Sequence, residues 1–233
     1  MSEGYQCDLC QDSRHVLENG VWVRCSCLKE LATSIKYARA GLTFPVDQLI
    51  NEEENIRKFF PDYCPDEDVR CYVANIQNAI AAKRCLSRTF CFSGRATSPK
   101  DFIVQCLLKT AVDAGFKVVQ LSLDSLINNH FKPNWDKEEE GESFSMLDEF
   151  AKADVFSLYF GSEIQFRIGE NYLTEIIRAH RLNFSNKTLL LNTSLSYSDL
   201  AYKYNDTFQS MFVEFNKDLK TKYTSQVVFL SVR

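Results

Sequence analysis

Four cysteines near the start of the chain have the residue type and spacing of a metal site. They form two close pairs, Cys7-x-x-Cys10 and Cys25-x-Cys27. Four thiolates are the ligand set of a tetrahedral structural Zn²⁺, and they leave no coordination position open for catalysis. The spacing therefore predicts a structural zinc knuckle. The alternatives are two disulfides, unrelated buried thiols, or a site in which His15 replaces one of the cysteines.

The residues between the two pairs predict a hairpin that brings them together. Fourteen residues separate the pairs, and apolar runs at 15–17 and 21–23 flank Asn19-Gly20. Asn-Gly is a favoured two-residue hairpin turn because both of its residues tolerate a positive φ. We therefore expect two short strands joined at this dipeptide.

A second candidate site is the loop that follows an apolar run at 89–93. Compared with the phosphate-binding pattern G-x-x-x-x-G-K-[ST], it keeps Gly94 and Lys100 but has Pro99 and Asp101 in place of the second glycine and the hydroxyl residue. Proline has no N–H to offer a phosphate, and an aspartate places negative charge beside it. The loop therefore predicts a degenerate nucleotide site. The alternatives are a coincidental loop between a strand and a helix, or a divergent site in which Asp101 holds a metal.

The acid that phosphoryl transfer requires is also missing from its expected place. It should end the strand expected at 154–160, but that run closes with Leu158, Tyr159 and Phe160. Without an acid to hold Mg²⁺ and position water, phosphoryl transfer loses its electrostatic basis. We therefore expect no ATP hydrolysis by this chain alone, and we predict no catalytic residue.

The elements that would position these residues follow from hydrophobic periodicity. Short apolar runs alternate with helical patterns, which argues for a parallel sheet covered on both faces. Ahead of this alternation, a helix is expected at 28–40, with Gly41 as its C-cap, and a short helix opens near 51–54. The later strands are expected at 89–93, 116–123, 154–160, 188–192 and 226–231, and the later helices at 69–82, 100–114 and 169–182.

Length and composition suit one full domain preceded by a small one. The chain has 233 residues, of which 45% are hydrophobic and 25% charged, so it is globular and has enough apolar residues for a core. We expect a knuckle at 1–30, a linker with adaptor helices at 31–68, and an α/β domain at 69–233. No signal peptide or membrane-spanning run is evident, and the other five cysteines lack framework spacing. The expected compartment is a reducing cytoplasm.

Net charge bears on nucleic-acid binding. The formal charge of −4 gives no global footprint for DNA, so any contact must be local. Candidate contacts to single-stranded DNA are Arg95, Lys100, Arg178 and Arg181, with aromatic residues nearby for base stacking. The alternative is that these are ordinary surface cations.

The order of these parts resembles the DnaC/DnaI-type replicative-helicase loaders of bacteria and phages. Those proteins join an N-terminal zinc-binding domain, which contacts the helicase, to a C-terminal AAA+ ATPase domain. The likeness is carried by the C-x-x-C-x-D run at 7–12, the C-x-C pair at 25–27, and the segments 69–94, 151–160 and 172–193. It implies a P-loop domain of the AAA+/RecA-like class, preceded by the knuckle and a helical linker.

The resemblance also implies which residues would contact a nucleotide. Asn192 falls near the sensor-1 position, and Arg233 resembles the terminal arginine after the last strand. Together with Gly94, Lys100 and Asp101, they form the degenerate nucleotide site. The arginine-finger motif of the family aligns with Ser210-Met211, so the finger is missing here. These losses indicate a pseudo-ATPase relative, and we take a phage to be its source.

The function expected from this reading is recognition. We predict a DNA replication accessory factor that binds the replicative helicase and, as a second candidate partner, single-stranded DNA. It is expected to hold Zn, to have no membrane partner, and to oligomerise on the helicase. One alternative is an active or nucleotide-binding AAA+ ATPase with divergent motifs. Another is a zinc-ribbon adaptor or inhibitor of a host replication or transcription protein.

Overall fold

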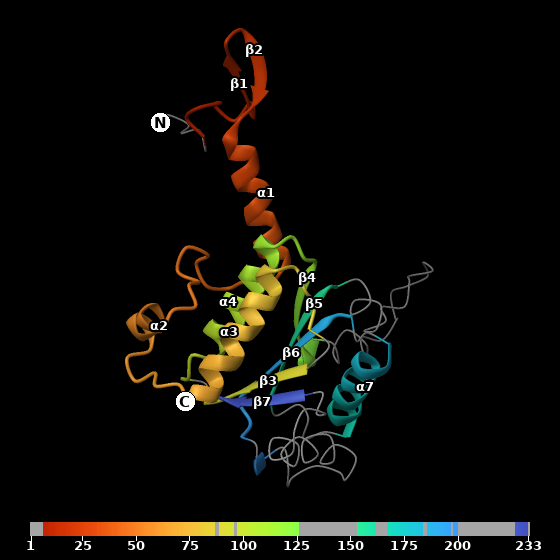
Figure 1. The fold of residues 1–233 in the computed structure, drawn as a ribbon. Helices are drawn as coiled ribbons and strands as arrows, with labels where there is room; N and C mark the ends of the chain where they lie inside the picture. Colours follow the sequence, from red (N-terminus) through yellow and green to blue (C-terminus); the bar gives the residue numbers. More distant parts are fainter. Residues whose placement is uncertain are drawn as a thin grey trace, which may run out of the picture.

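The computed structural model describes residues 7–86, 89–95, 97–125, 153–161, 167–183, 186–196, 198–199 and 227–232. Its centre is a five-stranded parallel sheet with the strand order β4-β5-β6-β3-β7 (Figure 1). The strands are β3 (Thr89–Ser93), β4 (Val118–Ser122), β5 (Val155–Phe160), β6 (Thr188–Thr193) and β7 (Val227–Ser231). The α/β class predicted from the sequence is therefore confirmed.

Helices cover both faces of the sheet, so its central strands are buried on both sides. Every residue of β3 and β6 is buried, as expected of strands that pack on two sides. Helices α3 (Glu67–Ala81) and α4 (Lys100–Asp113) lie on one side, and α7 (Arg167–Asn183) lies on the other (Figure 1). Side chains from all three helices share one core with the strands.

The strand order predicts a ligand site at one edge of the sheet. The chain leaves β3 for β4 at the far edge of the sheet, whereas β6 and β7 flank β3. Ser93 at the end of β3 is in register with Thr193 and with Ser231, so these carboxyl ends lie side by side. In open α/β sheets, ligands bind outside the carboxyl ends of strands where the strand order reverses.

The N-terminal hairpin forms as its sequence predicted. Strands β1 (His15–Glu18) and β2 (Val21–Arg24) pair antiparallel. Asn19 and Gly20 have φ angles of 50° and 81°, as a two-residue turn with the twist of the flanking strands requires.

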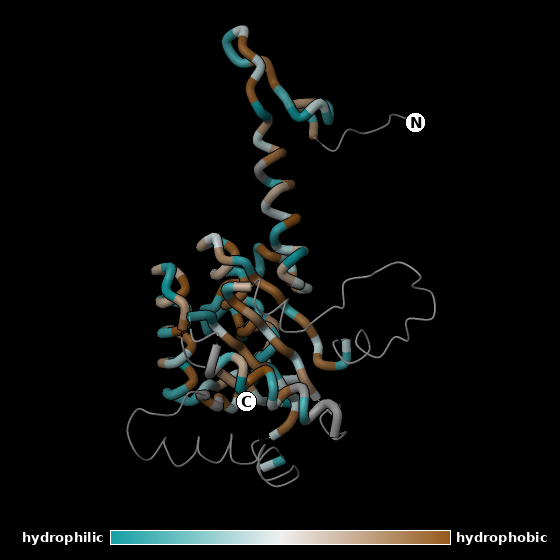
Figure 2. The backbone as a smooth tube through the Cα atoms, turned by 90° about the vertical axis from the view of Figure 1, so that its right-hand side faces the viewer, coloured by the Kyte–Doolittle hydropathy of each residue, from teal (hydrophilic) through white to brown (hydrophobic). Residues whose placement is uncertain are grey.

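Helix α1 (Ser26–Arg39) projects from the body and carries the hairpin at its far end (Figures 1 and 2). It ends in a Schellman motif, in which the Leu42 N–H donates to the Tyr37 carbonyl at 3.2 Å and the Gly41 N–H to the Ala38 carbonyl at 3.0 Å. Gly41 has a φ of 74°, which confirms its predicted role as the C-cap glycine. The helix is therefore a stalk that stops where it reaches the α/β body.

The segment between α1 and α3 packs onto α4. It contains the short helix α2 (Glu53–Phe59). The buried Gln105 side chain of α4 accepts hydrogen bonds from the N–H groups of Thr43 and Phe44, and the Phe44 ring packs edge-on against Phe102. The buried side chains of this segment belong to the same core as the sheet.

The division into units at 1–30, 31–68 and 69–233 stays a prediction, although α1 and α3 each run across one of its boundaries. Among the helices that the structure describes, none is long and apolar enough to cross a membrane.

Candidate functional site

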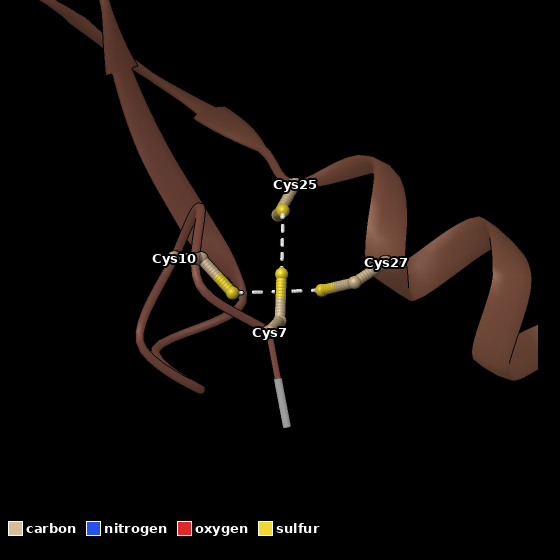
Figure 3. A group of neighbouring side chains, drawn as sticks. All are labelled: Cys7, Cys10, Cys25 and Cys27. Atoms are coloured by element: carbon tan, nitrogen blue, oxygen red, sulfur yellow. Dashed lines mark hydrogen bonds between the residues drawn. The ribbon is translucent and has the colours of Figure 1, made fainter. Parts of the chain in front are cut away.

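The four predicted zinc ligands come together at the base of the hairpin (Figure 3). Their sulfur atoms all lie within 4.8 Å of one another. The Sγ atoms of Cys7 and Cys25 are 3.8 Å apart, and those of Cys10 and Cys27 are 3.5 Å apart. Tetrahedral zinc with Zn–S bonds of about 2.3 Å separates its sulfurs by about 3.8 Å. The cluster therefore has the size and donor set that fit Zn²⁺.

The backbone around each pair explains this convergence. Cys7 and Cys10 lie in tight turns, where the Gln11 N–H donates to the Cys7 carbonyl at 2.8 Å and the Ser13 hydroxyl to the Cys10 carbonyl at 2.6 Å. Cys25 follows β2 directly and begins α1. The hairpin thus folds the second pair back onto the first.

The sulfur separations in the cluster are not those of disulfides. A disulfide joins its sulfurs at about 2.05 Å, well below the separations in the cluster. All nine cysteines are free thiols, and Cys91 and Cys106 are buried in the core like small apolar residues. Burial raises the pKa of the Cys106 thiol to about 12, which keeps it protonated and inert.

One thiol of the cluster is already biased toward its charged form. The backbone N–H of Cys27 stabilises the thiolate of Cys25 and lowers its pKa to about 7. The pKa of Cys27 itself is raised, first because its thiol hydrogen-bonds to Cys25 and then by burial. Four adjacent sulfurs cannot all ionise without a compensating cation, and a divalent metal supplies that charge.

The loop after β3 lies at the ligand-binding edge, but it is tightly packed. The Gly94 N–H donates to the Thr193 carbonyl at 3.2 Å, which ties the loop to β6. A Cβ atom on Gly94 would lie 2.3 Å from the Val232 carbonyl oxygen and 2.4 Å from the Ser98 hydroxyl. This glycine is therefore required by the packing of the chain against itself.

The lysine of the loop is buried and paired. Lys100 is 1% exposed, and its Nζ lies 3.1 Å from Oδ1 of Asp101. The same oxygen accepts a 2.6 Å hydrogen bond from Nδ2 of Asn192, at the end of β6. Three of the predicted nucleotide-site residues thus come together, but they contact one another.

Tyr159 lies near the end of β5, where the acid for phosphoryl transfer was expected. It pairs in register with Asn192, and its ring centroid lies 5.9 Å from the Lys100 ammonium. Asp154 is at the other end of β5, where its carboxylate accepts a 2.8 Å hydrogen bond from the Lys117 N–H. Asp154 therefore has a structural role far from the loop.

A pocket of about 920 Å³ opens beside the loop. It is lined by the loop itself, by 59–63 after α2, by residues following β6, and by the end of β7. Lys100, Asp101 and Asn192 are not among its lining residues. The pocket therefore stops at the loop and does not reach the buried ammonium.

The sequence did not point to two of these features. The segment 59–63, at the end of α2 and directly after it, lines the pocket, and no motif in it predicts this contact. Ser98 is buried, and its hydroxyl has no hydrogen-bond partner among the described residues. A hydroxyl inside a loop with an eroded pattern carries no sequence signal of its own.

The other predicted contacts have mixed outcomes. Arg95 and Arg178 are exposed on different elements, and their contact with DNA stays a prediction. Lys100 lies in the interior, so contact with a DNA strand would require the loop to open. Arg233, Ser210-Met211 and the side chain of Arg181 lie outside the described residues.

These residues do not fit the phosphates of a nucleotide. The buried Lys100 ammonium already has a carboxylate partner, and Pro99, which caps α4, has no N–H to donate. The end of β5, described as far as Gly161, presents no carboxylate for a metal. In this arrangement Asp101 occupies the ammonium of the expected degenerate site, and nucleotide binding there stays a prediction.

Comparison with known proteins places the fold. No protein-family model matches the sequence, and no curated protein does. Among solved structures, DnaI is similar at a TM-score of 0.51 and 12% identity, over 82% of this chain and 96% of that one. The DnaC helicase loader is similar at 0.50 and 17% identity, over 77% and 99%. AMPPCP-bound DnaA from Aquifex aeolicus is similar at 0.51 and 14% identity, over 75% and 50%.

The fold is therefore the α/β P-loop fold of the AAA+ class. The resemblance to DnaC/DnaI-type loaders expected from the sequence is confirmed as a likeness of fold. The chain spans about half the length of the DnaA structure, whereas it matches nearly all of the DnaI and DnaC chains.

Proposed function

We propose that this protein is a DNA replication accessory factor that works by binding the replicative helicase. The observation that carries the proposal is the cysteine cluster at the far end of the α1 stalk, held away from an AAA+-like body (Figure 1). A small module raised in this way reaches a partner without steric conflict from the body. In this proposal the knuckle contacts the helicase first, and the AAA+-like domain provides a second docking surface. We propose that the protein acts in the cytoplasm.

The knuckle presents an apolar surface suited to a protein partner. Leu17 and Trp22, on one face of the hairpin, are 59% and 68% exposed, whereas Val21, 63% exposed, lies on the opposite face. Leu17 is in register with Trp22 across the hairpin, so their Cβ atoms are neighbours. Aromatic and apolar anchors of this kind dominate protein interfaces. We assign this hairpin face to the helicase contact.

We propose that zinc holds the knuckle together. Cys7, Cys10, Cys25 and Cys27 supply four soft donors at zinc-like separations, and a hairpin of two short strands has no core of its own. A structural metal supplies the missing stability in such small units.

We also propose that ATP hydrolysis is lost. The pairing of Lys100 with Asp101 and the place of Tyr159 on β5 support this part of the proposal.

Single-stranded DNA is a secondary candidate partner, through Arg95 and Arg178, which are exposed. Charge reversal at both arginines should weaken single-stranded DNA binding, and unchanged binding would remove these residues from the proposal.

A second candidate function is nucleotide binding without hydrolysis. The pocket of about 920 Å³ beside Gly94 favours it, because it has room for a small molecule at the ligand-binding edge of the sheet. Thermal stabilisation of the wild-type protein by ATP would support this candidate. An adaptor or inhibitor of a host replication or transcription protein is the remaining alternative.

The direct test mixes the purified protein with the replicative helicase of the same replication system and separates the mixture by size exclusion. The proposal expects co-elution without added nucleotide. Failure to co-elute would contradict it. Capture of a different host replication or transcription protein would then favour the adaptor alternative.

A further inference from the structure

Lys100 is an unusual feature of the interior, because an ammonium group in a protein core needs a partner. It is 1% exposed and lies at the start of the 14-residue helix α4. An unpaired buried cation costs several kcal/mol, so its counter-charge decides whether this arrangement is stable. Among the described residues, Asp101 is the one carboxylate within ion-pair distance of it.

The Asp101 carboxylate is held by two groups on different elements. Its Oδ1 atom lies 3.1 Å from Nζ of Lys100, on α4, and 2.6 Å from Nδ2 of Asn192, on β6. Because the Asn192 amide turns its nitrogen toward this oxygen, its own Oδ1 is left buried without a partner. The amide orientation is therefore set by the carboxylate.

These contacts are those that an external anion would otherwise make. An ammonium and an amide N–H converge on one oxygen beside the first turn of α4, and groups of this kind at a helix N-terminus bind phosphates and other anions in proteins. Here the oxygen belongs to the residue next to the lysine. The carboxylate is covalently attached, so its local concentration exceeds that of any free anion.

We propose that Asp101 is a built-in occupant of the anion position in this loop. Its carboxylate neutralises Lys100, links α4 to β6 through Asn192, and excludes phosphate from the ammonium. Removing this one carboxylate uncovers an anion site that the rest of the loop still forms. The inference goes beyond the proposed function, since it does not depend on which partner the knuckle binds.

Thermal unfolding with inorganic pyrophosphate tests the proposal. The wild-type protein should show no shift in Tm when pyrophosphate is added. Asp101→Ser should unfold at a lower temperature, because Lys100 loses its counter-ion, and pyrophosphate should raise its Tm by about 2–4 °C. Sodium chloride at matched ionic strength should not reproduce this rescue.

The double variant Lys100→Met with Asp101→Ser is the control. It carries no buried ammonium, so it should fold and should not respond to pyrophosphate. Asp101→Asn keeps the shape of the side chain and serves as the second single variant if the serine variant does not fold. It should lose stability and regain part of it with pyrophosphate.

Two results would overturn the proposal. One is stabilisation of the wild type by pyrophosphate that Lys100→Met abolishes, because Asp101 would then not exclude the anion. The other is a folded Asp101→Ser variant that gains nothing from pyrophosphate. The same proteins can be mixed with the helicase, so failure of the helicase proposal is seen separately from failure of this one.

Discussion

Tyr37, near the end of the stalk helix α1, donates a hydrogen bond to Asp113, the last residue of α4. Lys109, one turn earlier on α4, pairs with the same carboxylate at 2.9 Å. Helix α4 begins at Lys100 in the degenerate loop. One helix therefore joins the packed loop to the base of the stalk, so the direction of the stalk is set by the α/β body.

Replacing Tyr37 by Phe should loosen the stalk. The change removes one hydrogen bond to a charged group, which lowers the free energy of unfolding by about 1.5–3 kcal/mol when the pair is buried. Because this pair is partly exposed, we expect a smaller loss. Burial, helped by Asp113, raises the pKa of Tyr37 to about 12. The contact is therefore present below pH 10 and is lost as pH rises through 12. Hydrogen exchange of residues 37–42 at neutral pH measures the loosening, and unchanged exchange would contradict it.

Metal analysis should find one zinc per chain. Cys10→Ser should remove it and unfold the hairpin, because zinc contributes about 10–16 kcal/mol in small zinc peptides. The α/β domain should keep its thermal transition, since its core does not include the knuckle. Cys71→Ser, an exposed cysteine outside the cluster, is the matched control and should keep its zinc. Metal retained at full occupancy by Cys10→Ser would contradict the assignment.

Gly94→Ala should destabilise the domain by steric overlap. The added Cβ would lie 2.3 Å from the Val232 carbonyl oxygen. This oxygen belongs to the backbone, so relieving the overlap requires the main chain to shift. Overpacking of this kind costs about 1–3 kcal/mol. Thr97→Ala, at an exposed position in the same loop, should be nearly neutral. Denaturant unfolding compares the two, and equal stability of both variants would show that Gly94 is free of this constraint.

His180 should make stability depend on pH. It is buried and accepts a hydrogen bond from the Thr89 hydroxyl, both of which favour the neutral ring, whereas its bond to the Lys187 carbonyl opposes this in part. Burial lowers its pKa below the ordinary value of about 6.5. The unfolded chain then binds the proton first, and stability falls as pH drops below about 6.5, by up to about 1.4 kcal/mol per unit. His180→Gln keeps the bond to Lys187 and should remove this slope. An unchanged slope would contradict the assignment.

Much of the fold could be predicted because its elements are short and strongly patterned. The run at 89–93 is buried throughout and forms β3 with the predicted bounds. Asn19-Gly20 and Gly41 adopt the positive φ angles for which their residue types are suited. Such signals are local, so they survive without knowledge of tertiary contacts.

The candidate site could be predicted only in part. The spacing of the cysteine pairs is enough to predict the metal cluster. The environment of the Lys100 ammonium, in contrast, depends on Asp101 and Asn192, which are 91 residues apart. From the sequence, Asp101 was expected to repel a phosphate or to hold a metal. The structure shows that it pairs with the neighbouring lysine instead. A contact between a helix start and a distant strand end has no signature in one sequence.

The central claim is that the knuckle binds the replicative helicase without nucleotide, and one affinity measurement tests it most directly. Helicase binding is measured by a titration with and without ATP, for the wild type, Cys10→Ser and the double variant Lys100→Met with Asp101→Ser. We predict that the wild type and the double variant bind with the same Kd, that ATP has no effect, and that Cys10→Ser loses binding at least tenfold. Equal binding by Cys10→Ser, or binding that requires ATP, would contradict the account.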